Sequence, residues 1–258
     1  MGRRSQTFAA CLVVVGIVVP PGFATPAARG SDSWAYTGQT GPAYWGLMGY
    51  DYLACKEGKA QSPVDIRDDS VRKSGLPPIV FHYQPSKLQI ADTGHTLEVS
   101  YTPGSFISIG NKRYELKEFH FHKPSEEKVN GKTYDMVAHL VHESADGELA
   151  VVAVLLTKGD KANSLVKMLW DNVPKKRRVE VSVDAVTIDA TELLPTDKSY
   201  YTFVGSLTTP PCTEGVTWLV LKTPTVVSAD EVARFAQLYP MNARPEQPLN
   251  GREVETGG

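Results

Sequence analysis

Short segments rich in β-branched and aromatic residues recur along most of the chain, and glycine, proline and aspartate separate them. Segments of this length and composition favour β-strands, and their regular interruption by turn residues favours antiparallel neighbours. The sequence therefore predicts a mostly antiparallel β protein. The predicted strands cover residues 88–90, 96–101, 106–109, 114–122, 136–142, 150–156 and 216–222.

Two stretches instead have the pattern of helices. Ser228 with Glu231 three residues later forms a capping box ahead of apolar residues at helical spacing, and Pro240 ends that pattern. Residues 163–170 also place apolar side chains at helical spacing, before Pro174. Both predicted helices would cover a sheet from the surface.

The N-terminal segment has a composition of its own. Two arginines precede an apolar run over residues 8–19, and small residues follow. This order is typical of a secretory signal peptide. A retained membrane anchor is the alternative, but twelve apolar residues fall short of the roughly 20 that span a bilayer. Cleavage after Ala24 and cleavage after Ala28 fit equally well, so we expect a signal peptide within residues 1–28 and an exported, periplasmic or extracellular protein.

Residues 29–258 show neither a shift in composition nor an internal repeat, which favours one domain. The chain has 27 Lys plus Arg against 29 Asp plus Glu, a formal net charge of -2. Such a balance does not favour a nucleic acid or an anionic membrane as partner. We interpret the basic run at 174–179 as a solvated turn. We expect a small-molecule substrate and no membrane association after removal of the signal.

Export also affects the interpretation of the three cysteines. Cys11 lies in the predicted signal, which leaves Cys55 and Cys212 in the mature chain. Two cysteines in an oxidising compartment favour one disulfide, and two buried free thiols are the alternative.

The segment 118–122 alternates histidine with phenylalanine. Strand geometry sends the imidazoles of His120 and His122 to one face and both phenyl rings to the other. A second β segment, which carries His139, follows after a turn that contains Asn130-Gly131. Antiparallel pairing of the two segments would bring the three imidazoles together.

Three protein ligands leave one tetrahedral position open, which is typical of catalytic rather than structural zinc. Zinc also lowers the pKa of a bound water to about 7. On spacing alone, an equal alternative is a pair of exposed sheet histidines with an unrelated third. His142 falls on the opposite strand face from His139, which predicts a structural, hydrogen-bonded histidine.

These histidines belong to a set of motifs that resembles the α-class carbonic anhydrases, in particular their exported bacterial members. The motifs occur in order over essentially the whole mature chain, so the resemblance implies a carbonic anhydrase catalytic domain over 29–258. It implies a large twisted, mainly antiparallel central sheet with a few short peripheral helices. The motifs are Gln61-Ser62-Pro63-Val64-Asp65-Ile66, Gly94-His95, Phe119-His120-Phe121-His122, Pro124-Ser125-Glu126, Ala138-His139-Leu140-Val141-His142, Gly205-Ser206-Leu207-Thr208-Thr209-Pro210-Pro211-Cys212, Val216-Thr217-Trp218 and the segment 242–250.

The resemblance also implies the roles of residues around a Zn²⁺ ion held by the three histidines. Thr208 would accept a hydrogen bond from zinc hydroxide and donate one to Glu126, which orients the nucleophile. His95 matches the proton shuttle of the family, and the ordinary histidine pKa of about 6.5 suits proton transfer to buffer. Without the resemblance, Thr208 would be interpreted as a turn residue, Glu126 as a surface charge and His95 as an exposed loop residue.

Further positions match the surroundings of the zinc in the family. Thr209 and Tyr36 match polar positions that order water. Cys55 and Cys212 match the paired cysteines of the exported members, in agreement with the predicted disulfide. The apolar wall that binds carbon dioxide is matched by Val141, Val151, Leu207 and Trp218, although each would also pass as a core residue.

One departure from the family concerns the third histidine. The family usually has a glutamate two residues before it, and this chain has Val137. A carboxylate there accepts the second N–H of the ligand, and its loss typically costs roughly 10 to 100-fold in metal affinity or activity. We therefore expect a functional but weaker zinc site at His139. Glu118, where many relatives have glutamine, would support His120 as a stronger acceptor. Glu127 stands where many animal relatives have histidine.

The predicted reaction is the zinc-dependent, reversible hydration of carbon dioxide to bicarbonate and a proton. One alternative is a weak or silent carbonic-anhydrase-like binding module, which the three intact histidines disfavour. The other is a zinc esterase, for which the sequence offers no acyl-pocket signature. The oligomeric state stays open at this stage, a homodimer included.

Overall fold

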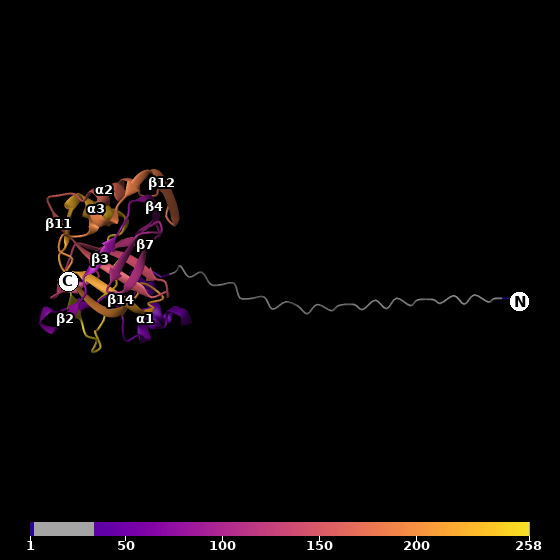
Figure 1. The fold of residues 1–258 in the computed structure, drawn as a ribbon, viewed down its shortest axis with the longest axis horizontal. Coiled ribbons are helices and arrows are strands. Elements are labelled where there is room, and N and C mark those ends of the chain that lie inside the picture. The colour runs from indigo at the N-terminus through magenta and orange to yellow at the C-terminus, as the bar shows by residue number, and fades with distance from the viewer. Residues whose placement is uncertain (3–33, 258) are drawn as a thin grey trace. The chain divides into compact units, whose positions relative to one another are not determined.

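Most strands of this protein belong to one large twisted sheet (Figure 1). The computed structural model describes residues 1–2 and 34–257, and in this part thirteen of sixteen strands form that sheet. The predicted signal peptide and Cys11 lie outside the described residues. The short strands β1 (Asp65–Ile66), β8 (Lys128–Val129) and β9 (Lys132–Thr133) form a second sheet, and the Asn130-Gly131 turn joins the last two.

The order of strands along the main sheet is β12-β4-β5-β7-β10-β11-β14-β13-β16-β2, with β6 and β3 attached beside β7 and β15 beside β11. Most neighbours are antiparallel, as predicted, although β11 pairs in parallel with β14 and β15. The strands of this sheet are β2 (Arg72–Leu76), β3 (Ile79–His82), β4 (Ser86–Asp92), β5 (Leu97–Ser100), β6 (Phe106–Ile109), β7 (Lys112–His122), β10 (Met136–Ser144), β11 (Leu149–Gly159), β12 (Val179–Ile188), β13 (Tyr200–Ser206), β14 (Glu214–Leu221), β15 (Thr225–Ser228) and β16 (Glu255–Gly257).

All seven predicted strands are present, and the sheet also contains strands that were not predicted from the sequence. The clearest of these is β12, which pairs with β4 and has mostly exposed or half-buried side chains. Its apolar residues nevertheless form one face, because Val181, Val183 and Val186 pack half-buried against the larger apolar cluster and Ile188 is buried. This alternation of valine with polar residues is a strand pattern that the sequence prediction missed. The preceding basic run is an exposed turn with Arg178 at φ 60°, as predicted.

The alternation along β7 separates two apolar clusters on the two faces of the sheet. Phe119 and Phe121 are fully buried in the larger cluster, together with Leu140 of β10. The opposite face carries the two histidines of β7, and the second cluster there contains Val137 and Trp218. One strand therefore anchors itself in the core with its phenyl rings and presents its imidazoles on the other face.

Two helices pack side by side against the sheet (Figure 1). In α2 (Ser164–Asp171), the Asn163 side chain accepts the N–H of Val166, and α3 (Ala229–Leu238) has the predicted capping box of Ser228 and Glu231. Each such cap stabilises a helix by about 1 kcal/mol.

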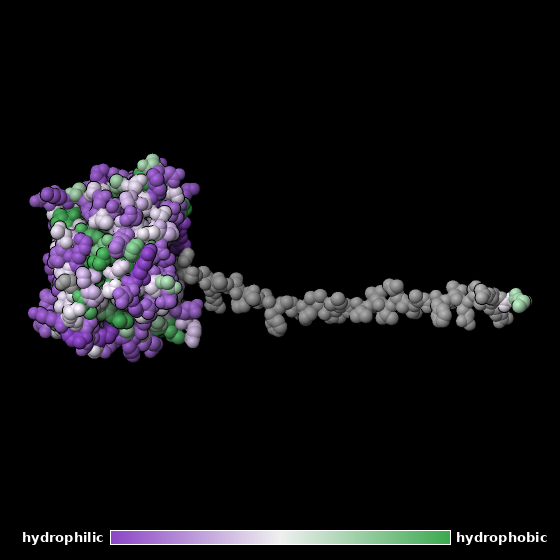
Figure 2. Space-filling view, viewed as in Figure 1, coloured by the Kyte–Doolittle hydropathy of each residue, from purple (hydrophilic) through white to green (hydrophobic). Residues whose placement is uncertain are grey.

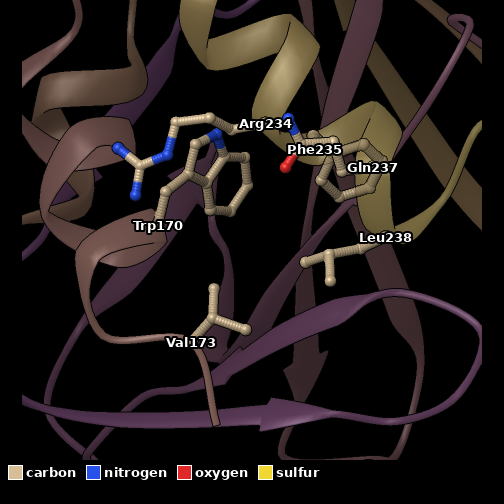
Figure 3. A pocket seen from close by; sticks show the side chains of 6 residues that line it. All are labelled: Trp170, Val173, Arg234, Phe235, Gln237 and Leu238. Carbon is tan, nitrogen blue, oxygen red and sulfur yellow. The ribbon is translucent and has the colours of Figure 1, made fainter. Parts of the chain in front are cut away.

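Aromatic stacking joins the two helices. The rings of Trp170 and Phe235 stack with centroids 5.4 Å apart (Figure 3). Arg234 of α3 also forms an ion pair with Asp171 of α2 at 2.9 Å. The sequence did not predict the remaining short helices. Four of them lie near the start of the described chain: α1 (Ala54–Glu57) and the 3-10 helices η1 (Gly38–Thr40), η2 (Trp45–Leu47) and η3 (Tyr50–Tyr52). Two further 3-10 helices, η4 (Asp68–Ser70) and η5 (Ala190–Leu193), follow along the chain.

The predicted disulfide is present. Cys55 in α1 is bonded to Cys212, which lies in the turn between β13 and β14. Trp45 packs beside this bond and is fully buried. The bond therefore ties the N-terminal helices to the turn that carries Thr208 and Thr209.

The surface agrees with the balanced composition of the chain. The face in Figure 2 is mainly hydrophilic, and its apolar residues form scattered patches. Within residues 1–2 and 34–257, no helix combines the length and apolarity that crossing a membrane requires.

Candidate metal centre

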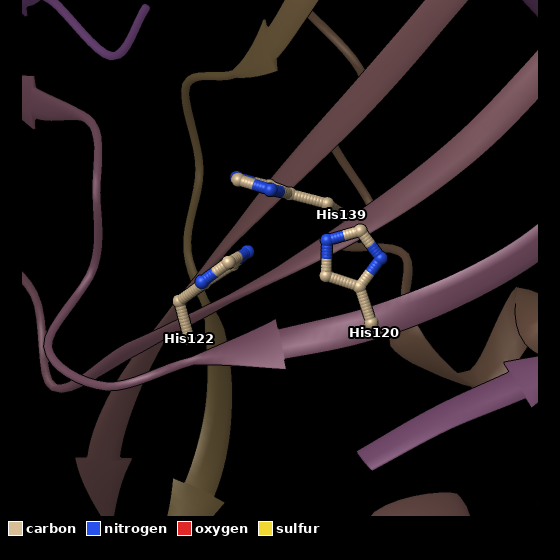
Figure 4. Close-up of side chains that lie close together, drawn as sticks. All are labelled: His120, His122 and His139. Atoms are coloured by element: carbon tan, nitrogen blue, oxygen red, sulfur yellow. The ribbon is translucent and has the colours of Figure 1, made fainter. Parts of the chain in front are cut away.

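Three imidazoles converge where β7 and β10 pair (Figure 4). His139 stands directly opposite His120 in the antiparallel register, as the sequence predicted, and His122 follows two residues along β7. The ring centroids lie 5.0 Å (His120 to His122), 5.5 Å (His120 to His139) and 4.7 Å (His122 to His139) apart. One nitrogen of each ring lies within 4.8 Å of one nitrogen of the other two. The arrangement can hold one metal ion.

Hydrogen-bond acceptors outside the metal position fix the orientation of the two rings on β7. Nδ1 of His120 lies 2.9 and 3.0 Å from the two carboxylate oxygens of Glu118, as predicted. Nδ1 of His122 lies 2.8 Å from the carbonyl oxygen of Asn242. An acceptor at one ring nitrogen places the proton there and leaves the other nitrogen as an unprotonated donor for a metal.

The third ring also has a carboxylate acceptor, which corrects the sequence-based prediction. Val137 is buried among apolar side chains, but both carboxylate oxygens of Glu127 lie 3.1 Å from Nε2 of His139. The prediction that His139 lacks such a partner was therefore wrong. The acceptor comes from the segment before β8 instead of from β10, and spacing along one strand gives no sign of it.

The buried atoms of the site fit a metal ion. Among the described residues, Nε2 of His122 is buried and has no hydrogen-bond partner, which is costly for a polar atom unless a ligand satisfies it. Burial, with the neighbouring imidazoles, lowers the pKa of His122 and of His139 well below the ordinary value. Both rings are thus neutral, the form that binds metals. Burial also lowers the pKa of His120, but Glu118 outweighs it and the net direction is upward.

Beside the histidines lie two buried carboxylates. Burial, with the neighbouring Glu127, raises the pKa of Glu126 to about 8, although the Arg244 amide and a hydrogen bond with the Thr208 hydroxyl lower it. The Arg244 N–H donates to Oε1 of Glu126 at 2.7 Å. Burial likewise raises the pKa of Glu127 to about 8. A divalent cation at the three rings would favour the ionised form of both carboxylates.

Several predicted residues border a cavity of about 300 Å³ in front of His120 and His122. The ring of His95 is half-buried there and stacks on Trp34, with centroids 3.7 Å apart and an interplanar angle of 10°. Of the predicted wall and polar positions, those that line the cavity are Tyr36, Val141, Leu207 and Thr209. The predicted wall residues Val151 and Trp218 do not line it; they are buried, 2% and 1% exposed, and the Trp218 ring lies 4.9 Å from that of His139.

The comparisons with known proteins agree with this geometry. The model of the eukaryotic-type carbonic anhydrases matches residues 40–257. The chain belongs to this family, in its α class. It is 40% identical over 233 residues to a carbonic anhydrase of Nostoc sp., an alignment that covers 89% of this chain and 88% of the relative. It is 42% identical over 228 residues to a carbonic anhydrase of Klebsiella pneumoniae, covering 87% and 91%.

Solved structures give the same result. The α-carbonic anhydrase of Thermovibrio ammonificans in complex with sulfanilamide superposes with a TM-score of 0.84 at 39% identity, covering 88% of this chain and 100% of that one. A dioscorin complexed with ascorbate superposes with a TM-score of 0.81 at 34% identity, covering 87% and 98%. The chain is an enzyme of the carbonic anhydrase type, a family that is generally zinc-dependent, and its histidine triad is positioned to bind a metal ion.

Two structural roles in this carbonic anhydrase were missed in the sequence. Asn242 supplies the carbonyl acceptor of His122, and Arg244 holds Glu126 through its main-chain N–H. The Arg244 guanidinium also donates to carbonyl oxygens of Ser62 and Cys55, so it links Glu126 to the disulfide region. Both residues lie in the matched segment 242–250, but their contacts are with residues more than a hundred positions away.

Proposed function

We propose that the protein catalyses the zinc-dependent, reversible hydration of carbon dioxide to bicarbonate and a proton. The observation that carries the proposal is the convergence of three oriented imidazoles, one of them with a buried unpartnered nitrogen, beside a cavity that His120 and His122 line. Three ligands from the protein leave a coordination position for a water molecule. When bound, zinc lowers the pKa of that water to about 7 and so supplies a nucleophile at neutral pH.

Thr208 and Glu126 are proposed to orient the nucleophile. The carboxylate of Glu126 is held by the Arg244 N–H, and it would accept the proton of the Thr208 hydroxyl, whose proximity lowers the pKa of Glu126. When the Thr208 hydroxyl donates its proton to Glu126, its oxygen can only accept a hydrogen bond from the nucleophile. This would orient one lone pair of the nucleophile for attack. Thr208 is 5% exposed, which keeps competing water from the hydroxyl.

His95 is proposed to transfer the product proton to buffer. It lies in the same cavity as His120 and His122, and its ring is half-exposed rather than enclosed. Stacking on Trp34 holds the imidazole beside the path to solvent. The apolar side chains of Val141 and Leu207 line the same cavity and would bind carbon dioxide weakly, while Thr209 would order water.

Stopped-flow measurement of carbon dioxide hydration by the zinc-loaded protein tests the proposal. We expect turnover far above that of buffer, loss of turnover on chelation and recovery on adding zinc. His139→Ala should abolish both zinc binding and turnover. His82→Ala is the matched control, because His82 is exposed and stacks on Phe106 away from the cavity. Hydration no faster than in buffer alone would refute the proposal.

The proton transfer has its own test. His95→Ala should lower turnover about 100-fold in dilute buffer. Added imidazole should restore it, while zinc content stays that of the wild type. Turnover of the variant equal to that of the wild type in dilute buffer would exclude His95 as the shuttle.

We also propose that residues 1–28 are a signal peptide and that the catalytic domain, 29–258, is exported to the periplasm or beyond. The disulfide between Cys55 and Cys212 supports export, because such bonds persist in oxidising compartments. N-terminal sequencing of the protein recovered from an exporting host is the test. A mature chain that begins after Ala24 or Ala28 is expected, and retention of the first residues would contradict export.

A further inference from the structure

Glu127 is a buried carboxylate with an unusual position beside the metal centre. Its side chain is fully buried, and both of its oxygens lie 3.1 Å from Nε2 of His139. Burial of a carboxylate is costly unless hydrogen bonds or charges compensate for it. The two contacts with one ring nitrogen of His139 are the interactions that offset the cost of burying this carboxylate.

The main chain around Glu127 is firmly held. The Ser125 hydroxyl donates to the Glu127 carbonyl oxygen at 2.8 Å and accepts the N–H of Tyr134 at 2.9 Å. The next residue, Lys128, begins β8 and pairs with Asp65 of β1. Such support fixes the main chain from which the carboxylate projects, which is what an orienting group requires.

The contact determines which nitrogen of His139 faces the metal. An acceptor at Nε2 places the ring proton there, so Nδ1 is the unprotonated atom. Nδ1 is also the nitrogen on the side of Glu126, 3.9 Å from its Oε2. In His120 and His122 the outer acceptors hold Nδ1 instead, and Nε2 is left for the metal.

We infer that Glu127 is a positioning residue of the metal centre, which fixes the His139 tautomer from the loop before β8 while position 137 on β10 carries an apolar side chain. This inference rests on the proposed zinc site and deepens it. The same support reaches each ligand from a different part of the chain: from β7 itself through Glu118, from the C-terminal segment through Asn242 and from this loop through Glu127.

The first test compares zinc affinity by chelator competition in the wild type and in Glu127→Gln, which keeps the shape of the side chain and removes its charge. We expect an affinity about 10 to 100-fold lower in the variant. Glu148→Gln is the matched control, since Glu148 is exposed and pairs with Lys112 at 3.0 Å; its zinc affinity should equal that of the wild type. Equal affinities of Glu127→Gln and the wild type would overturn the inference and leave the proposed function standing.

A second readout does not depend on the variant folding. In zinc-loaded wild-type protein with ¹⁵N-labelled histidine, NMR should show the His139 proton on Nε2 and the metal-bound nitrogen as Nδ1. The opposite assignment would overturn the inference even if the variant lost affinity, because a merely structural Glu127 could weaken the site without setting the tautomer. Failure of the wild type to bind zinc at all would instead overturn the proposed function, and this inference with it.

Discussion

His142 provides a test of the folded core that is independent of the metal. Its ring is fully buried, with Nε2 2.8 Å from the hydroxyl of Tyr83 and Nδ1 3.3 Å from the carbonyl oxygen of Ala150. Both contacts suit a neutral ring that donates from Nδ1 and accepts at Nε2. Burial lowers the pKa of His142 to about 3, although the carbonyl groups of Ala150 and Leu140 raise it.

This lowered pKa gives the free energy of unfolding a defined dependence on pH. The unfolded imidazole has a pKa of about 6.5, so between pH 6.5 and 3 the unfolded chain binds a proton that the folded chain excludes. The contribution to stability is complete above pH 6.5 and is lost as the pH falls. From pH 7 to pH 4.5 the loss from this one group is about 2.5 kcal/mol, and below pH 3 it approaches about 5 kcal/mol.

Urea unfolding at pH 7 and pH 4.5 measures the effect in the wild type and in His142→Gln. Glutamine keeps a donor and an acceptor for Tyr83 and Ala150 but does not titrate. Both proteins are used metal-free, so that the remaining histidines and carboxylates titrate alike and cancel in the difference. We expect the wild type to lose about 2.5 kcal/mol more than the variant. Equal losses would refute a neutral, buried His142, and His82→Gln should behave like the wild type.

Three further predictions concern the turn after β13 and the cap of α3. Thr208→Ala should lower kcat/KM for carbon dioxide hydration in stopped flow about 100-fold at unchanged zinc content, because the nucleophile loses its orientation; an unchanged kcat/KM would contradict the proposed role. The double variant Cys55→Ser/Cys212→Ser should lose about 5 kcal/mol in denaturant unfolding, since the bond joins residues 157 positions apart, and equal stability would show that the unfolded chain is not constrained by the bond. Ser228→Ala should cost about 1 kcal/mol by removing the capping box, measured the same way, and no change would mean that Glu231 caps the helix unaided.

Local pattern was sufficient for the parts of the fold that carry the site. The alternation in β7 predicted which face its histidines occupy, and the capping box predicted the first residue of α3. The edge strand β12 was missed although valine alternates with polar residues along it, and its half-buried valines pack against the larger apolar cluster beside β4. The parallel pairs of β11 were also out of reach, since they join segments that are distant in the sequence.

The three histidine ligands of the candidate site could be predicted from local pattern, whereas most of their outer hydrogen-bond acceptors could not. His120, His122 and His139 sit on β7 and β10, which pair as antiparallel neighbours, so spacing and alternation suffice to bring them together. Glu118 is two residues from its ring and follows from the same alternation. Asn242, by contrast, reaches His122 across 120 positions, which only the folded chain brings into contact.

Position 137 shows what this difference means for reading a sequence of this family. A missing carboxylate at one position indicates a weaker site only if no other segment can reach the same ring nitrogen. Here Glu127 reaches Nε2 of His139 from a loop twelve residues away in the chain, which leaves Val137 free to pack in the apolar cluster behind the metal centre. What the chemistry requires is an acceptor at that nitrogen, and more than one element of the fold can supply it. The zinc affinity of Glu127→Gln therefore measures the contribution of the acceptor itself rather than that of a fixed sequence position.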